Sequence, residues 1–246
     1  PVFDLLSSRV YVSTEEGEIL AVDPINGSVV GPSFSVGQRI TSAPTIADGK
    51  LLVATNDAAI FGFDLNSGAA LPWSPIVIGG SVEGDTTVAN SILYVASADG
   101  FLYGIDINDG SRAFYAKVDE GTLLTAPIIA PDGSILIATN TQKLIAYAPA
   151  DDRAPKWVAE VGFLVSKSTP VIVGDAEEWT AYVPATQPPS TGVITAISSK
   201  GELQWKAEVP GRIETAAAIG GGRIFVSTDN QDAMAFEIGA PVHRDL

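Results

Sequence analysis

The sequence contains no cysteine and only one histidine. Without cysteine the chain can form no disulfide bond, no thiolate nucleophile and no cysteine-ligated zinc or iron–sulfur cluster. A serine hydrolase triad needs a histidine base, and the single candidate, His243, lies near the C-terminus, where we expect it to be exposed. Metal sites built from two or three histidines are excluded as well. The sequence therefore indicates no catalytic residue and no metal ligand.

Basic residues are also scarce. The 246 residues include 14 Lys and Arg against 29 Asp and Glu, which gives a formal net charge of -15. A protein this acidic repels phosphate, so we expect no nucleic-acid partner and no binding to anionic lipid. No apolar run approaches the length of a membrane-spanning helix, so we expect no membrane insertion of this segment. The chain begins with Pro1 rather than Met, which favours a mature or excised segment.

The sequence does contain an internal repeat. Three similar stretches end in a polar turn: EILAVDPING at 18–27, AIFGFDLNSG at 59–68 and FLYGIDINDG at 101–110. A repeat of about 40 to 45 residues that contains several strands is typical of a β-propeller blade. Short β-branched or aromatic segments recur at that interval, and their last residues, 41 to 46 positions apart, are Ser13, Ala54, Ala96, Ala138, Pro184 and Ser227.

Each repeat predicts four short antiparallel strands. In the second repeat we expect them near 43–47, 51–54, 60–64 and 76–78, because apolar segments alternate with turn residues and no helical periodicity is present. The sequence thus predicts an all-β fold with almost no helix. We expect a single β-propeller domain over 1–246, with about six blades of four strands, or a piece of a larger propeller. Little sequence remains for the fourth strand of the sixth repeat.

The polar turn of the third repeat raises the alternative of a calcium site. Asp106, Asn108 and Asp109 provide oxygen atoms, but the glycine falls at position 5 of the loop instead of 6, and position 12 is Lys117 rather than Glu. The Asn-Gly, Ser-Gly and Asp-Gly pairs of the three copies allow positive φ, and the preceding Asp can accept hydrogen bonds from backbone N–H groups. We therefore interpret these stretches as turns.

The stretches LYVASADGFLYGIDINDG and RVYVSTEEGEILAVDPINGSVV, the second followed by ITSAPTIADGKLLVA, resemble the repeats of the pyrroloquinoline-quinone (PQQ)-like propeller superfamily. The resemblance covers nearly the whole chain. The superfamily includes quinoprotein dehydrogenases and non-catalytic scaffolds such as the BamB-type outer-membrane assembly lipoproteins, so it implies a fold more than a function. It also implies that an aromatic residue after each turn docks on the neighbouring blade: Trp73, Trp157 and Trp205, with Phe34 and Tyr115 as replacements in the first and third repeats.

In this superfamily, quinoprotein catalysis needs PQQ held over calcium by carboxylate and amide side chains, an Asp base and, in many members, a disulfide. This chain cannot form the disulfide, its loops are short, and it has about six blades where those enzymes usually have eight. We therefore expect no cofactor, and PQQ with calcium belongs to the alternative interpretation. The resemblance further implies an extracytoplasmic location, which includes the periplasm, the cell surface and secretion.

In a propeller, the segment leading into each inner strand borders the mouth of the central channel. Aligned on the Pro or Thr that begins the inner strand, these segments place charges at equivalent positions, and a Pro-rich loop, PATQPPSTG, opens on the same face. Glu83 and Asp85 are also the nearest pair of carboxylates for glycoside hydrolysis, an alternative that stays open. We expect a ligand- or partner-binding face formed by Arg39, Thr41, Glu83, Asp85, Lys167, Arg212, Glu214 and Gln187.

A second insertion, GDAEEW at 174–179, is expected on the opposite face, where Trp179 either packs locally or offers an aromatic anchor. From these features we expect a non-catalytic β-propeller scaffold that binds a protein or a small polar ligand at one face. One alternative is a PQQ- and calcium-dependent oxidoreductase or its remnant, which a bound quinone with calcium would favour. Another is a sensor module of a larger receptor or kinase, which extra sequence beyond the present chain would favour.

Overall fold

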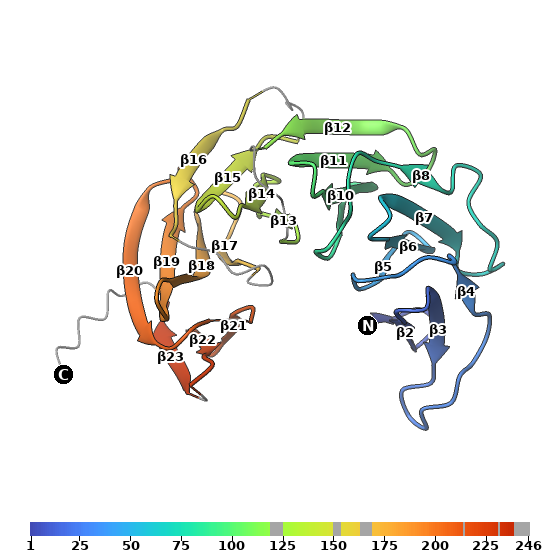
Figure 1. The fold of residues 1–246 in the computed structure, drawn as a ribbon, viewed down its shortest axis with the longest axis horizontal. Helices are drawn as coiled ribbons and strands as arrows, with labels where there is room; N and C mark the ends of the chain where they lie inside the picture. Colours follow the sequence, from blue (N-terminus) through green and yellow to red (C-terminus); the bar gives the residue numbers. More distant parts are fainter. Residues whose placement is uncertain (119–124, 150–153, 163–168, 214, 231, 239–246) are drawn as a thin grey trace. The chain divides into compact units, whose positions relative to one another are not determined.

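The regular structure of the described residues is entirely β-strand. Strands β1 to β23 form six antiparallel sheets, each built from consecutive strands (Figure 1). Successive small antiparallel sheets are the blades of a β-propeller, as the repeat predicted, and we number them blades 1 to 6 in chain order. No helix occurs among the described residues, and hence none that is long and apolar enough to cross a membrane. The computed structural model describes residues 1–118, 125–149, 154–162, 169–213, 215–230 and 232–238.

Residue contacts divide the chain into two compact units, Pro1–Pro127 and Ile128–Leu246. The first unit contains blades 1, 2 and 3, with four strands each. The four strands expected in the second repeat are confirmed as β5 to β8. The strands are β1 (Val2–Asp4), β2 (Arg9–Ser13), β3 (Glu18–Val22) and β4 (Phe34–Ser35) in blade 1; β5 (Thr45–Ala47), β6 (Lys50–Ala54), β7 (Ala59–Asp64) and β8 (Ile76–Val77) in blade 2; β9 (Thr87–Ala89), β10 (Ile92–Ala96), β11 (Phe101–Asp106) and β12 (Arg112–Lys117) in blade 3.

The second unit contains blades 4, 5 and 6. Blade 6 has three strands among the described residues, and a fourth would fall on 239–246, outside them. The expectation of a single domain over 1–246 stays a prediction. The strands are β13 (Ile128–Ile129), β14 (Ile135–Ala138), β15 (Lys143–Tyr147) and β16 (Trp157–Glu160) in blade 4; β17 (Val171–Gly174), β18 (Trp179–Gln187), β19 (Thr191–Ser198) and β20 (Leu203–Pro210) in blade 5; β21 (Ala218–Gly220), β22 (Arg223–Ser227) and β23 (Ala233–Glu237) in blade 6.

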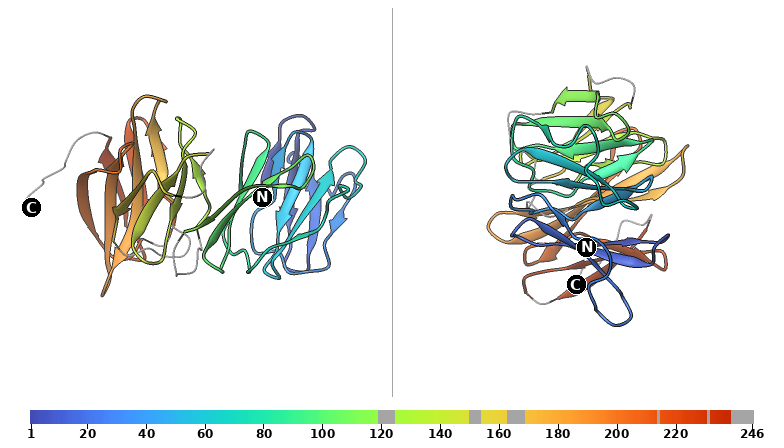
Figure 2. Two further views of the ribbon diagram at one scale, coloured as in Figure 1. Left: turned by 90° about the horizontal axis from the view of Figure 1, so that it is seen from above. Right: turned by 90° about the vertical axis from the view of Figure 1, so that its right-hand side faces the viewer.

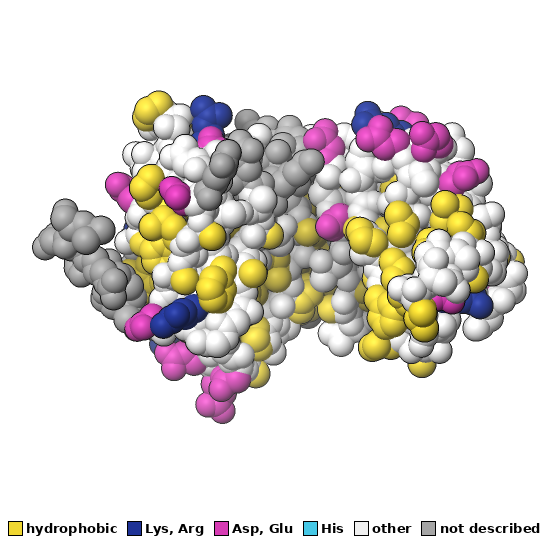
Figure 3. Space-filling view, turned by 90° about the horizontal axis from the view of Figure 1, so that it is seen from below, with side chains coloured by type: hydrophobic (Ala, Val, Ile, Leu, Met, Phe, Trp, Pro, Cys, Tyr) yellow, Lys and Arg dark blue, Asp and Glu magenta, His cyan; other side chains and the backbone are white. Residues whose placement is uncertain are grey.

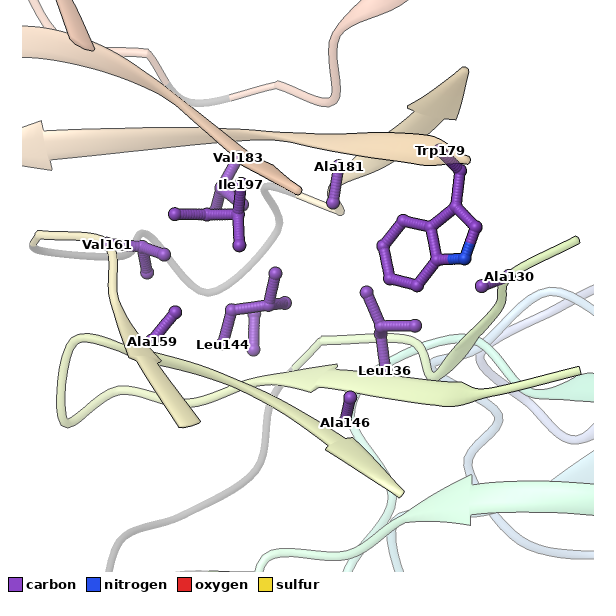
Figure 4. Packing of buried hydrophobic residues seen from close by; sticks show 11 residues of the cluster. Ala130, Leu136, Leu144, Ala146, Ala159, Val161, Trp179, Ala181, Val183 and Ile197 are labelled. Carbon is purple, nitrogen blue, oxygen red and sulfur yellow. The ribbon is translucent and has the colours of Figure 1, made fainter. Parts of the chain in front are cut away.

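Within each unit, neighbouring blades lie face to face (Figure 2). Apolar side chains are buried between them. In the first unit, Phe34 of β4 packs against Phe63 of blade 2, with ring centroids 5.2 Å apart. In the second, Trp179 begins β18, is 1% exposed and packs beside Leu136 and Ala130 of blade 4 (Figure 4). This confirms docking on the next blade for Phe34 and local packing for Trp179.

Two tryptophans join blades by the same contact. Trp73 donates a hydrogen bond from Nε1 to the carbonyl oxygen of Ile107 in blade 3 at 3.2 Å. Trp157 donates to the carbonyl oxygen of Ser199 in blade 5 at 3.0 Å. Trp205 packs in the cluster formed by blades 5 and 6. The predicted docking of these residues on neighbouring blades is confirmed. In the first two contacts the indole covers a turn glycine so closely that an added Cβ atom would lie within 2.7 Å of it; these glycines are Gly110 and Gly201.

Tyr115 does not replace the docking tryptophan in blade 3, contrary to the prediction. It stacks on Phe101 of its own blade, with centroids 4.7 Å apart, and packs into the cluster between blades 2 and 3. Side chains alternate between the two faces of a strand, so the preceding residue, Phe114, occupies the other face. Phe114 is 2% exposed and meets Tyr94 edge-on at 6.0 Å. The aromatic residue on the face that faces away from blade 2 is therefore Phe114.

The polar stretches after the third strands of blades 1, 2 and 3 are turns, as interpreted from the sequence. The carboxylate of Asp64 accepts hydrogen bonds from the backbone N–H groups of Ser67 and Asn66 at 2.7 and 3.1 Å. These bonds, above all the one from Ser67, hold the pKa of Asp64 below its ordinary value of 3.8. Asp23 and Asp106 accept the same kind of backbone bond. The closing glycines, with φ of 73 to 76°, are Gly27, Gly68 and Gly110.

Candidate functional site

Except for Gln187, which ends β18, the expected binding residues belong to the lead-in segments, which we define as the stretches between the last strand of one blade and the first strand of the next. The segments that enter blades 2, 3 and 6 meet the turn between the second and third strands of the blade that they enter. We call this end of the blades the lead-in end. A backbone N–H of the turn donates to the same position of the segment in three blades: Asn56 to Arg39, Ala98 to Ser81 and Asp229 to Arg212, at 3.4, 2.8 and 3.0 Å.

These bonds confirm that Arg39, Ser81 and Arg212 are structurally equivalent, as their alignment on the inner strands predicted. The turn thus holds the backbone at each position before any partner arrives.

Arg39 extends into solvent and pairs with Glu15 of the turn between β2 and β3. Its Nη2 lies 3.0 Å from Glu15 Oε2, and the two side chains are 54% and 73% exposed. Water and salt screen an ion pair this exposed, so it contributes little to stability. The charges of Arg39 and Glu15 are therefore available to a partner at little cost to the fold.

Thr41 and Asp85 connect adjacent lead-in segments. Thr41 donates from Oγ1 to the carbonyl oxygen of Val82 at 3.0 Å. Asp85 accepts the backbone N–H of Ala43 at its Oδ1, at 2.7 Å. Each bond spans about one repeat, so it ties the segment entering blade 2 to the segment entering blade 3. The structure thus gives Thr41 and Asp85 a structural role, and their part in binding stays a prediction.

Glu83 lies in the same segment as Asp85 but differs in environment. Its side chain is exposed, and no hydrogen bond or ion pair ties it to another described residue. Since Asp85 is engaged by a backbone N–H while Glu83 faces solvent, the two carboxylates are not arranged as a buried acid and base. The glycoside hydrolase interpretation gains no support from this geometry.

In the second unit, Arg212 meets the Pro-rich loop between β18 and β19. Its Nη2 lies 3.4 Å from the carbonyl oxygen of Pro189, and its backbone N–H donates to Asp229 Oδ1 at 2.7 Å. The sequence placed the loop and Arg212 on one face, and these contacts confirm that they lie together.

The loop is the tip of a long hairpin that is held in place. β18 and β19 pair as far as Gln187 and Thr191, and Thr191 also forms a parallel bridge with Gly211. Thr186 Oγ1 accepts the N–H of Ile213 at 3.1 Å and lies 3.2 Å from its carbonyl oxygen. The side chain of Gln187 is exposed. The tip therefore presents Gln187 beside Arg212 from a fixed backbone.

Two residues of the expected face, Lys167 and Glu214, lie outside the described residues. The sequence analysis missed two residues that belong to the face, Glu15 and Asp229. Both occupy the second position of the turn between the second and third strands, the position of Asn56 in blade 2. Aligning those turns in addition to the inner strands would have identified them.

Catalytic members of the superfamily bind PQQ together with calcium. Such a site needs several oxygen ligands around one point. Among the described residues, no three His, Asp or Glu side chains gather closely enough to hold a metal ion. The carboxylates of Asp64 and Asp106 already accept bonds from their own turns, and Asp85 holds Ala43. The donor set of this part of the chain does not fit PQQ with calcium, and we derive no redox step from it.

Comparison with known proteins identifies the fold. No protein-family model matches the sequence, and no curated protein matches it either. Among solved structures, the chain is similar to BamB from Moraxella catarrhalis, with a TM-score of 0.62 and 16% sequence identity over 98% of this chain and 83% of that one. At this identity the likeness shows a shared β-propeller fold, in agreement with the fold that the repeats predicted.

Proposed function

We propose that this chain is a non-catalytic propeller scaffold that binds a protein, or a small polar ligand, at the lead-in end of its blades. The fold that it shares with BamB supports a scaffold that binds protein. The described residues add a second argument, because no three of their His, Asp or Glu side chains gather closely enough to hold a metal ion for catalysis.

The proposal depends mainly on one observation, the combination of a fixed backbone and an exposed side chain at Arg39 and Arg212. Both have a backbone fixed by the adjoining turn, and both have exposed side chains. A partner that binds such residues loses less conformational entropy than one that must order a mobile loop. Arginine is also among the residue types that most often dominate the binding energy of protein interfaces. The mixed charges of Glu15, Arg39 and Glu83 favour a partner with a mixed polar surface over a simple polyion.

Site-specific photo-crosslinking in cells that produce the protein tests this proposal. A photo-reactive amino acid placed at Gln187 should give a discrete crosslinked product. One placed at Asn66, an exposed residue in the turn after β7, should not. Adding Arg212→Glu should lower the yield of that product without changing the circular dichroism spectrum. The same products from both positions, or a yield unaffected by the charge reversal, would count against this end of the blades as the binding face.

We also propose that the chain works without a cofactor and outside the cytoplasm, on the strength of the repeat resemblance and the shared fold. Titration with PQQ plus calcium, followed by visible absorbance and thermal shift, tests the first point. We expect no saturable change at high micromolar PQQ. One-to-one binding with stabilisation would overturn the non-catalytic assignment and call for assays with alcohols and aldose sugars.

A further inference from the structure

The turn after β3 of blade 1 contains a modification motif in addition to its turn residues. Asn26, Gly27 and Ser28 form the sequence Asn-X-Ser, in which X is not proline. This is the acceptor motif for N-linked glycosylation, a modification of exposed loops in proteins that leave the cytoplasm. No other asparagine of the 246 residues is followed two positions later by Ser or Thr. The chain therefore offers one acceptor, and the structure shows how it is presented.

The side chains of Asn26 and Ser28 are both exposed. At Asn26 this exposure does not depend on what lies beside blade 1, as the other blades show. The residue before the turn glycine is Ser67 in blade 2, Asp109 in blade 3 and Lys200 in blade 5, and all three are exposed. In each of these blades a side chain of the preceding blade covers the glycine itself. The position of Asn26 therefore faces solvent even where a neighbouring blade is docked.

The motif is held in a defined turn. Asn26 Oδ1 accepts the backbone N–H of Ser28 at 2.9 Å, which is an Asx-turn. Gly27 has a φ of 73° and donates its N–H to the carbonyl oxygen of Asp23 at 2.9 Å. The side-chain nitrogen of Asn26, Nδ2, is the atom to which a saccharide is attached. It lies 3.4 Å from Asp23 Oδ2, and it keeps one hydrogen for this contact after attachment.

The turn itself does not require asparagine. In blade 3 the same three positions are Asp109, Gly110 and Ser111, and Asp109 Oδ1 accepts the N–H of Ser111 at 2.8 Å. A carboxylate thus forms the same Asx-turn but has no amide nitrogen. The feature that distinguishes Asn26 is therefore its Nδ2 atom. Blade 3 also offers a matched position, because one substitution there completes the motif.

We propose that Asn26 is the acceptor of an N-linked saccharide. Nδ2 attacks the anomeric carbon of a saccharide carried on a polyprenyl diphosphate. The new C–N bond forms as the bond from the anomeric carbon to the diphosphate oxygen breaks, the diphosphate leaves with the electron pair, and Nδ2 gives up one proton to a base of the transferase. The transferase is a separate enzyme that acts outside the cytoplasm, so this inference rests on the extracytoplasmic location proposed above.

The saccharide lies away from the proposed binding face. β2 and β3 are antiparallel, so the turn after β3 is at the end of blade 1 opposite to Glu15, which lies in the turn between these strands. A partner at the lead-in end and a saccharide on Asn26 are therefore compatible. Hydrophobic side chains are exposed on the first unit, at the right of Figure 3. Ile25, beside Asn26, is 94% exposed, and a saccharide next to it increases solubility.

Tandem mass spectrometry of the full chain, purified from the cells that naturally produce it, tests the proposal. We expect the tryptic peptide of residues 10–39 in a form with saccharide mass on Asn26. Ser28→Ala keeps Asn26 but removes the hydroxyl that the motif requires, so the modified form should be lost. Asn66→Gln, in the corresponding turn of blade 2, should leave it unchanged. Saccharide on Asn26 of the Ser28→Ala variant would overturn the assignment to N-linked transfer.

The substitution Asp109→Asn provides a gain-of-function test. It completes the motif in the equivalent turn of blade 3, and we expect this variant to carry a second saccharide. A variant modified only at Asn26 would overturn the argument that this turn position presents the acceptor.

Cell fractionation separates this inference from the proposal on which it rests. An unmodified wild-type peptide from an extracytoplasmic fraction would overturn the inference and leave the proposed location intact. An unmodified peptide from a protein found in the cytoplasm would overturn both.

Discussion

The indole N–H of Trp73 donates to the carbonyl oxygen of Ile107, 3.2 Å away in the following blade. The contact connects blade 2 to blade 3. The indole ring covers Gly110, and the hydrogen bond holds the turn that contains this glycine. Trp157 and Ser199 repeat the arrangement in the second unit. The turn glycine therefore serves two purposes, since it adopts positive φ and leaves room for the neighbouring indole.

The contact between Trp73 and the turn predicts that two Gly→Ala substitutions lower the free energy of unfolding by different amounts. Gly27 and Gly110 have φ of 73° and 76°, so replacing either by Ala introduces backbone strain of about 1 kcal/mol. Only at Gly110 does the new Cβ atom meet a side chain, 2.5 Å from Trp73 Cβ. We expect Gly110→Ala to lower the free energy of unfolding by about 2 to 4 kcal/mol, and Gly27→Ala by about 1 kcal/mol. Urea denaturation measures both. Equal losses would show that Trp73 does not press on the turn.

Asp85 and Glu83 form a second matched pair. Asp85 accepts the N–H of Ala43 from the neighbouring lead-in segment, whereas Glu83 faces solvent. We expect Asp85→Ala to destabilise the protein by about 1 kcal/mol, the usual net value of one hydrogen bond, and Glu83→Ala by less than about 0.5 kcal/mol. Thermal unfolding of the two variants at the same pH measures the difference. A larger loss for Glu83→Ala would contradict the structural role given to Asp85.

The hydrogen bonds of Asp132 with Lys156 and Ser134 predict that the fold loses stability in acid. Burial by itself raises the pKa of Asp132, but hydrogen bonds from Lys156 Nζ at 2.9 Å and from the N–H and Oγ of Ser134 outweigh it, so the pKa lies below its ordinary value of 3.8. A carboxylate whose pKa is lower in the folded state stabilises the fold above the unfolded value, and the stabilisation is lost as pH falls through the folded value.

The loss of stability should therefore occur below about pH 4. Between pH 5 and pH 2, we expect the free energy of unfolding of the wild type to fall more steeply than that of Asp132→Asn. Asp57→Asn, at an exposed residue, should follow the wild type. Parallel curves for the wild type and Asp132→Asn would show that the bonds to Lys156 and Ser134 do not depend on the charge of the carboxylate.

The repeat made most of the fold predictable. Spacing alone located the strands of blade 2, because a strand that packs on both faces leaves a short apolar run bounded by turn residues. The aromatic replacement in blade 3 was wrong, since two adjacent aromatics, Phe114 and Tyr115, point to opposite faces and the sequence does not state which face meets which blade.

The candidate site was less predictable than the fold. Alignment on the inner strands found Arg39 and Arg212, but the roles of the side chains depend on groups a full repeat away. Nothing in the sequence around Asp85 indicates that its carboxylate accepts the N–H of Ala43.

The tip of the hairpin between β18 and β19 gives a prediction that links stability to binding. Thr186 Oγ1 accepts the N–H of Ile213 and thereby holds the tip against the segment of Arg212. Thr186→Val keeps the shape of the side chain but removes the hydroxyl, so the hydrogen bond between the Ile213 N–H and Thr186 is lost at a cost of about 1 to 3 kcal/mol. We expect faster hydrogen exchange at Ile213 and a lower yield of the product crosslinked from Gln187, although residue 186 itself need not touch the partner. Thr180→Val is the control, since Thr180 lies on the same strand and donates only to the exposed Gln204. If Thr186→Val speeds exchange and leaves the crosslink unchanged, the partner does not depend on the position of this tip.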